Sequence, residues 1–178
     1  GPGTPLFAAT PTVGANVAVV DPNLASRRQV RVLDLGGSSR GARALWKRYL
    51  RNAGGAIWVV RPGPGLDDLP AQIDDAVAFM AEVEEHGAAQ SMVDAPPKAI
   101  AVVMLGGSSG TSRNQWAEAA DVLLAAARAC LYLRLAVVDA TSMSSRDALI
   151  AGLAALDNLD CEPWSSPQAA LISPHLHA

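Results

Sequence analysis

A regular alternation of short apolar runs with longer helical stretches constrains the fold of this chain more than any other feature. The continuous apolar runs are typical of strands buried on both faces of a sheet, and they lie at residues 56–60, 99–105 and 133–139. The helical stretches lie at residues 40–51, 67–86, 114–131 and 147–159. This alternation predicts an α/β domain with a mostly parallel sheet and helices on both of its faces.

The first two strands are expected to pair differently from the rest. Residues 16–21 (NVAVVD) and 30–35 (VRVLDL) are predicted to be strands, and the segment between them contains Pro22 and Asn23, which suit the turn of an antiparallel hairpin. A length of 178 residues suits a single domain. We place that domain at residues 4–160 and expect the tail, residues 161–178, to pack on the sheet or to add a strand to it.

Composition and charge exclude several classes of protein. Half of the side chains are hydrophobic and 17% are charged, which excludes a disordered chain. The two cysteines cannot form a disulfide framework and favour the reducing cytoplasm. A net charge of −3, without a stripe of Lys and Arg, argues against a nucleic-acid partner. Because no apolar run is long enough to span a bilayer and no signal peptide is evident, we expect no membrane anchor.

Motifs that would carry catalysis or metal binding are weak. The sequence lacks the string GxxxxGK[ST] that cradles phosphates, so Gly36 and Gly37 either bind an anion at a helix start or only permit a tight turn. His175 and His177 have no companion ligands nearby in the sequence. Cys130 lies in an apolar helical stretch and is most simply a buried small hydrophobe. We therefore predict no catalytic residue and no metal site.

A methyltransferase is one alternative for the glycine-rich segment. Residues 32–41 (VLDLGGSSRG) resemble the strand and loop that hold S-adenosylmethionine in Rossmann-like methyltransferases. Those enzymes need an acid at the end of the next strand, to bind the ribose hydroxyls. Here Arg61 and Pro62 stand at that place, so the sequence supports a methyltransferase only weakly.

Four segments together resemble the ADP-ribosylation-factor-like (Arf-like) small GTPases. They follow the family order of switch I, interswitch hairpin, switch II and the next strand, and they are TPTVG at 10–14, DLGG at 34–37, LWKRY at 45–49 and GAIWVV at 55–60. The resemblance runs from Thr10 to about Leu159 and is most specific before residue 60. It implies the small-GTPase fold, in which the first two strands of this chain form the antiparallel hairpin.

The resemblance also implies roles for particular residues. Thr12 matches the switch threonine that meets the magnesium ion, and Asp34 matches the acid that holds this ion through water. Gly36 or Gly37 matches the amide that contacts the terminal phosphate of GTP. The hydrophobic surface that binds protein partners in the family is matched by Val13, Ala15, Leu33, Trp46 and Tyr49.

The departures from the family pattern are large. The phosphate loop with its lysine should precede switch I, but only a few residues stand before Thr10. Ser38 stands where the family has the glutamine that orients the attacking water. Residues 106–109 (GGSS) stand where the family has the base-reading motif Asn-Lys-x-Asp. Each lost charge-assisted contact costs a few kcal/mol of binding free energy. The summed cost would remove the binding free energy of roughly 12 kcal/mol that a nanomolar affinity requires. We therefore predict a non-enzymatic pseudo-GTPase that needs no cofactor and binds protein partners in trafficking or ciliary machinery. Residual binding of GTP or GDP with Mg²⁺ is the alternative.

One strand of the family sheet has no obvious counterpart. The strand that leads into the phosphate loop lies in the middle of that sheet, and its loss would expose two unpaired edges. Its place could be taken by a remnant at residues 3–9, by residues 169–173 of the tail, or by a partner chain in a homo- or hetero-oligomer. We favour the tail or the partner chain.

Overall fold

The computed structural model describes most of the predicted core of the chain. The described residues are 15–20, 30–35, 46, 48–50, 52–63, 68–90, 98–106, 111–161 and 169–172. The predictions for Thr12, Val13, Gly36 and Gly37 lie outside them, as does the possible remnant strand at residues 3–9.

The centre of the structure is a parallel sheet of four strands. These are β3 (Gly55–Val60), β4 (Lys98–Leu105), β5 (Leu133–Ala140) and β6 (Ala169–Ile172), which lie in this order. The register pairs Val60 with Met104 and Met104 with Asp139, so the carboxyl ends of β3, β4 and β5 share one edge. The strands β4 and β5 are almost entirely buried, as continuous apolar runs in a parallel sheet should be.

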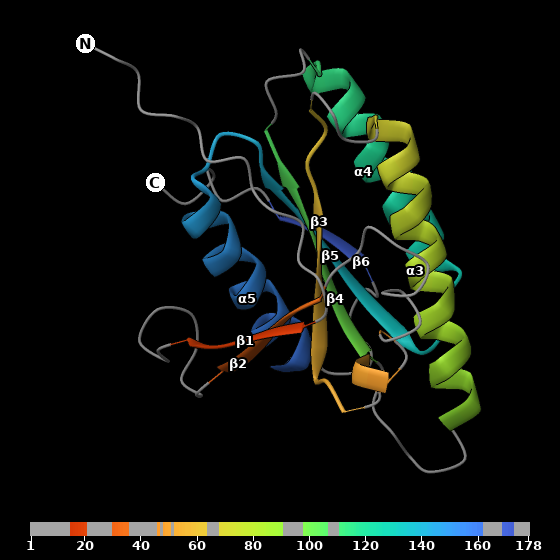
Figure 1. Cartoon of the computed structure of the whole chain (residues 1–178). Coiled ribbons are helices and arrows are strands. Elements are labelled where there is room, and N and C mark those ends of the chain that lie inside the picture. The colour runs from red at the N-terminus through yellow and green to blue at the C-terminus, as the bar shows by residue number, and fades with distance from the viewer. Residues whose placement is uncertain are drawn as a thin grey trace.

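A separate two-stranded sheet forms the predicted hairpin. Strands β1 (Ala15–Val20) and β2 (Val30–Leu35) are antiparallel, and Val17 lies opposite Leu33. With a mostly parallel sheet, one antiparallel hairpin and helices on both faces, the predicted α/β class is confirmed (Figure 1).

Helices cover the four-stranded sheet from both sides. Helices α3 (Leu69–Gln90) and α4 (Arg113–Arg128) lie on one face, and α5 (Ser145–Cys161) lies on the other (Figure 1). Side-chain oxygens of Asp68, Ser112 and Ser144 accept hydrogen bonds from backbone N–H groups of the first turns of these helices. Residues 46 and 48–50 are helical as well; the rest of the helix predicted at 40–51 is outside the described residues.

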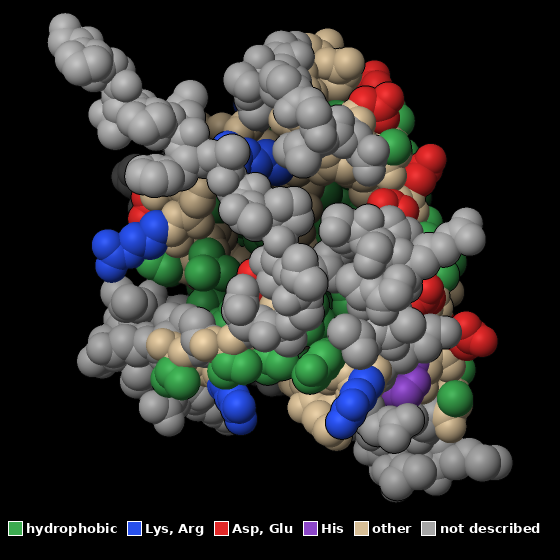
Figure 2. Space-filling view, viewed as in Figure 1, with side chains coloured by type: hydrophobic (Ala, Val, Ile, Leu, Met, Phe, Trp, Pro, Cys, Tyr) green, Lys and Arg blue, Asp and Glu red, His purple; other side chains and the backbone are tan. Residues whose placement is uncertain are grey.

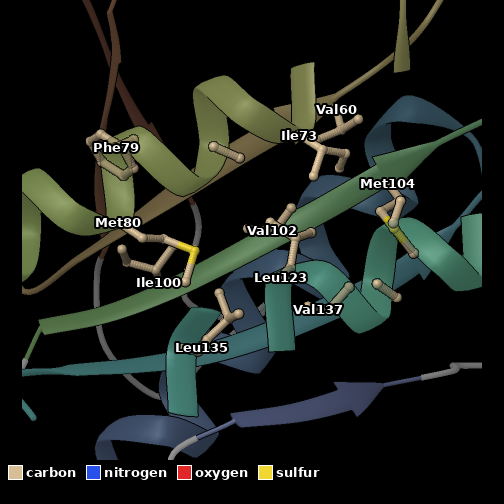
Figure 3. Close-up of a cluster of buried hydrophobic side chains, with 14 of the residues drawn as sticks. Val60, Ile73, Phe79, Met80, Ile100, Val102, Met104, Leu123, Leu135 and Val137 are labelled. Carbon is tan, nitrogen blue, oxygen red and sulfur yellow. The ribbon is translucent and has the colours of Figure 1, made fainter. Parts of the chain in front are cut away.

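The larger core lies between the sheet and helices α3 and α4. Bulky side chains of the two helices pack against bulky side chains of the strands. Ten residues of this core are labelled in Figure 3: Val60, Ile73, Phe79, Met80, Ile100, Val102, Met104, Leu123, Leu135 and Val137. Three aromatic rings extend this core toward the helical turn at residues 46–50. The Trp46 ring meets Trp58 edge-on with centroids 5.2 Å apart and meets Phe79 at 5.6 Å.

The core on the α5 side consists mainly of small residues. Ala101, Ala136 and Ala155 are buried there, so the helix axis can lie close to the strands. Gly152 sits at the closest approach, since an added Cβ would lie 2.9 Å from Val103 Cγ2. Alanines and a glycine thus set the spacing between α5 and the sheet.

Polar groups that join the elements are satisfied by backbone partners. The buried Arg134 guanidinium donates to the carbonyl of Leu159 at 2.8 Å, near the end of α5. The Glu84 carboxylate accepts from the backbone N–H groups of Leu131 and Tyr132, both at 2.7 Å. Burial, and secondarily the Glu84 charge, raises the pKa of the Cys130 thiol. The hydrogen bonds of Glu84 fix the loop before β5 to helix α3, and the hydrogen bond of Arg134 fixes β5 to the end of α5.

The tail does contribute a strand, but at an edge. Strand β6 pairs in parallel with β5, with Ala169 opposite Leu135 and Ile172 opposite Val138. It therefore lies at the end of the sheet opposite β3, and the hypothesis that the tail replaces the missing strand in the middle of the sheet is wrong. The apolar side chains of β5 explain this position, because they offer a long buried strand on which the tail can pair.

We expect Trp46→Ala to lower the free energy of unfolding by about 3–5 kcal/mol, because Trp46 is 8% exposed and packs against two other rings. Urea denaturation measures this change. The control is Val122→Ala on α4, where the side chain is 49% exposed and the change should stay within about 0.5 kcal/mol. Equal effects of the two substitutions would contradict the buried position of Trp46.

Candidate functional site

The residues predicted to hold a nucleotide are described only at one position. Asp34 is exposed near the end of β2, opposite Asn16 on β1. Thr12, Gly36 and Gly37 lie outside the described residues. The predicted nucleotide site therefore stays a prediction.

The shared carboxyl edge of β3, β4 and β5 is where an open α/β sheet usually binds its ligand. Arg61 follows β3 directly. The side-chain amide of Gln72 on α3 binds both the backbone N–H and the backbone carbonyl of Arg61. Arg61 N–H donates to Gln72 Oε1 at 2.8 Å, and Gln72 Nε2 donates to the Arg61 carbonyl at 3.2 Å. These two hydrogen bonds hold the end of β3 against the first turn of α3.

The acidic residue at the end of β5 is engaged by its own loop. Asp139 Oδ1 accepts from Thr141 Oγ1 at 2.7 Å and from the backbone N–H of Thr141 at 3.1 Å. Three residues further on, Ser144 Oγ donates to Asp147 Oδ2 at 2.6 Å at the start of α5. The carboxylates of this loop thus shape the turn from β5 into α5.

The backbone after β4 lies against this same loop. Because Leu105 pairs with Ala140, the next residues, Gly106 and Thr141, lie side by side. A Cβ added to Gly106 would overlap the carbonyl oxygen of Thr141. This position, which the resemblance to the family matched with the first residue of the base-reading motif, has no space for a side chain.

The hairpin presents an apolar surface that we call the hairpin face, formed by Val17, Val19 and Leu33. Cross-strand partners share a face of a sheet, and the register places Val17 opposite Leu33 and Val19 opposite Arg31. The exposed fractions are 54% for Val17, 63% for Val19 and 36% for Leu33. Figure 2 shows hydrophobic side chains gathered at the surface over the hairpin.

The structure divides the predicted partner surface. Leu33 is exposed and Tyr49 is half-buried, so both can contribute to a surface. Trp46 is buried between Trp58 and Phe79, and we correct its predicted surface role to a core role. For Ala15 the structure describes only the backbone, which pairs with Leu35, and Val13 lies outside the described residues.

Val17 and Val19 were missed by the sequence analysis. The strand reads NVAVV over residues 16–20, so three valines and an alanine stand on alternate faces and composition does not tell which face is exposed. The pairing register supplies that information, because Leu35, on the same face as Leu33, packs against the larger core. The hairpin face therefore continues from a buried end to an exposed one.

Within the described part of the chain, no group of three or more His, Cys, Asp or Glu side chains could hold a metal ion. A search of the same residues finds no helix with the length and apolar character needed to cross a membrane.

Comparison with known proteins gives one match. Residues 4–63 match the model of the ADP-ribosylation factor family, which is about a third of the chain and contains β1, β2 and β3. This match supports a relationship of the segment to the Arf-like small GTPases. No curated protein and no solved structure matches the chain significantly.

We expect Gly106→Ala to lower the free energy of unfolding by about 1–3 kcal/mol, since the backbone of Thr141 must move to admit the methyl group. The matched control is Gly54→Ala, because no atom lies within 4 Å of a Cβ at Gly54 and its backbone is outside the left-handed region. That substitution should be neutral or stabilise by up to about 1 kcal/mol. Thermal and urea unfolding compare the two variants, and an unaffected Gly106→Ala would disprove the close approach.

Proposed function

We propose that this chain is an Arf-like pseudo-GTPase that works as a protein-interaction module and does not hydrolyse GTP. The observation that carries the proposal is the hairpin face, where two valines are more than half exposed on a two-stranded sheet. Exposed apolar patches of this kind mark protein-binding surfaces. The family match over residues 4–63 supports placing the module among trafficking or ciliary proteins of the cytoplasm.

The sheet edge after β4 and β5 supports the loss of nucleotide binding. A guanine-binding site needs an aspartate carboxylate that accepts two hydrogen bonds from the base, which the serines at 108 and 109 cannot imitate. The close approach of Gly106 to Thr141 leaves no space for a side chain at the start of this loop. Asp139, the acid near the end of β5, already accepts two hydrogen bonds from Thr141.

A GTP- or GDP-binding switch is the second candidate. It is favoured by the family match and by the exposed position of Asp34, the residue that would hold Mg²⁺ through water. The third candidate, a methyltransferase, has less support, because Arg61 follows β3 where an acid would bind the ribose. A pseudo-GTPase explains both the family-like first third and the altered base-reading loop.

A thermal-shift titration separates these candidates. A ligand at a hundred times its dissociation constant stabilises a protein by about 2.7 kcal/mol, which raises the melting temperature visibly. We expect no shift with GTP, GDP or S-adenosylmethionine in magnesium buffer. A shift with GTP or GDP that is lost in Asp34→Asn would replace the pseudo-GTPase with the switch.

The hairpin face is tested by partner capture with matched surface variants. Leu33→Asp puts a charge on the hairpin face, and Leu149→Asp puts the same charge at a similarly exposed site on α5 (36% and 39% exposed). We expect a partner bound by the unmodified chain to be lost with Leu33→Asp, because the carboxylate would be buried unpaired, and kept with Leu149→Asp. Equal capture by both variants would remove the hairpin face from the contact.

A further inference from the structure

The outer edge of β1 lacks the features that keep edge strands apart. Its six residues, Ala15–Val20, contain no charge and no proline. Among the described residues β1 pairs with β2 alone, and the N–H and C=O groups along its other edge pair with no described strand. Natural edge strands are usually protected by lysine, proline or a bulge. An uncharged edge beside two exposed valines is therefore suited to pairing with another strand.

We propose that a second copy of this chain pairs with this edge, through antiparallel β1 strands related by a two-fold axis at Ala18. A two-fold axis perpendicular to the sheet keeps each side chain on its own face, so it places Val17 of one copy opposite Val19 of the other. The two hairpins then form one antiparallel sheet in the order β2-β1-β1-β2. Val17 and Val19, each more than half exposed in the monomer, would be covered by the same two valines of the other copy.

The charges on the hairpin are compatible with this arrangement. Arg31 lies opposite Val19. Each of the two rows of side chains that contain the exposed valines therefore has one Arg31, two valines and one Leu33 across the four strands. The two Arg31 side chains lie on the two outer strands and in different rows, so they are at least three strand spacings, about 14 Å, apart. This separation exceeds the Debye length of about 10 Å at 0.1 M salt, so repulsion between them is weak.

The other strand edges fit a second copy less well. Strand β2 carries Arg31 and Asp34 among its six residues. Strand β3 is uncharged, but its Trp58 and Val60 already pack in the larger core, so pairing there would cover little more than Val59. Strand β6 has only four residues. The edge of β1 combines length, absence of charge and exposed apolar side chains.

This inference rests on the proposed function only in that both use the hairpin for protein contact. The self-association does not depend on nucleotide, so a GTP-induced thermal shift would overturn the pseudo-GTPase and leave the dimer standing. A monomeric chain would overturn the dimer and leave the nucleotide result unchanged.

Sedimentation of the full chain over a range of concentrations tests the pairing and its register. The unmodified chain should reach twice the monomer mass as concentration rises. Val17→Lys and Val19→Glu should each weaken the dimer by at least about tenfold, because each buries two unpaired charges. An equimolar mixture of the two variants should recover association, since the introduced ammonium of one chain then faces the introduced carboxylate of the other.

Two controls make the result specific. Val122→Lys adds the same charge at a 49% exposed site on α4 and should leave the dimer unchanged. Circular dichroism should show that all variants keep their fold, since the substituted valines are exposed. A chain that stays monomeric, or variants that fail to associate better when mixed than alone, would overturn the proposal. Open-ended growth beyond the dimer would overturn it too, because a two-fold contact closes on itself.

Discussion

The parallel register of β3, β4 and β5 is the constraint on which the rest of the structure depends. It aligns the carboxyl ends of the three strands, so Arg61, Gly106 and Thr141 come to one edge. It also orients alternate side chains to opposite faces, with bulky residues toward α3 and α4 and small ones toward α5. The close contact between Gly106 and Thr141 follows from this pairing.

The first third of the chain and the rest of it differ in character. The first third matches the ADP-ribosylation factor family and includes the hairpin, whose apolar residues are exposed. The remaining strands and helices form the buried body of the α/β sheet, where the loops after β4 and β5 touch through their backbones. Both of our proposals start from an exposed apolar hairpin beside a buried parallel sheet.

Most of the fold could be predicted because its signals are local. The runs at 99–105 and 133–139 have nothing but apolar or small side chains, apart from one arginine and one aspartate, and they became β4 and β5 within a residue at each end. The site was harder to predict, because exposure depends on partners distant in sequence. Trp46 and Leu33 are both large and apolar, yet Trp46 is buried by Trp58 and Phe79 while Leu33 lies at the surface.

By itself the sequence determined the α/β class, the antiparallel hairpin and the resemblance to a GTPase family, since periodicity and short motifs are properties of neighbouring residues. Only the tertiary structure decided that β6 pairs with β5, that Gly106 lies against Thr141, and which side of β1 remains exposed. These outcomes depend on strand register and on long-range packing. A change of one residue in register would turn every side chain of a strand to its other face.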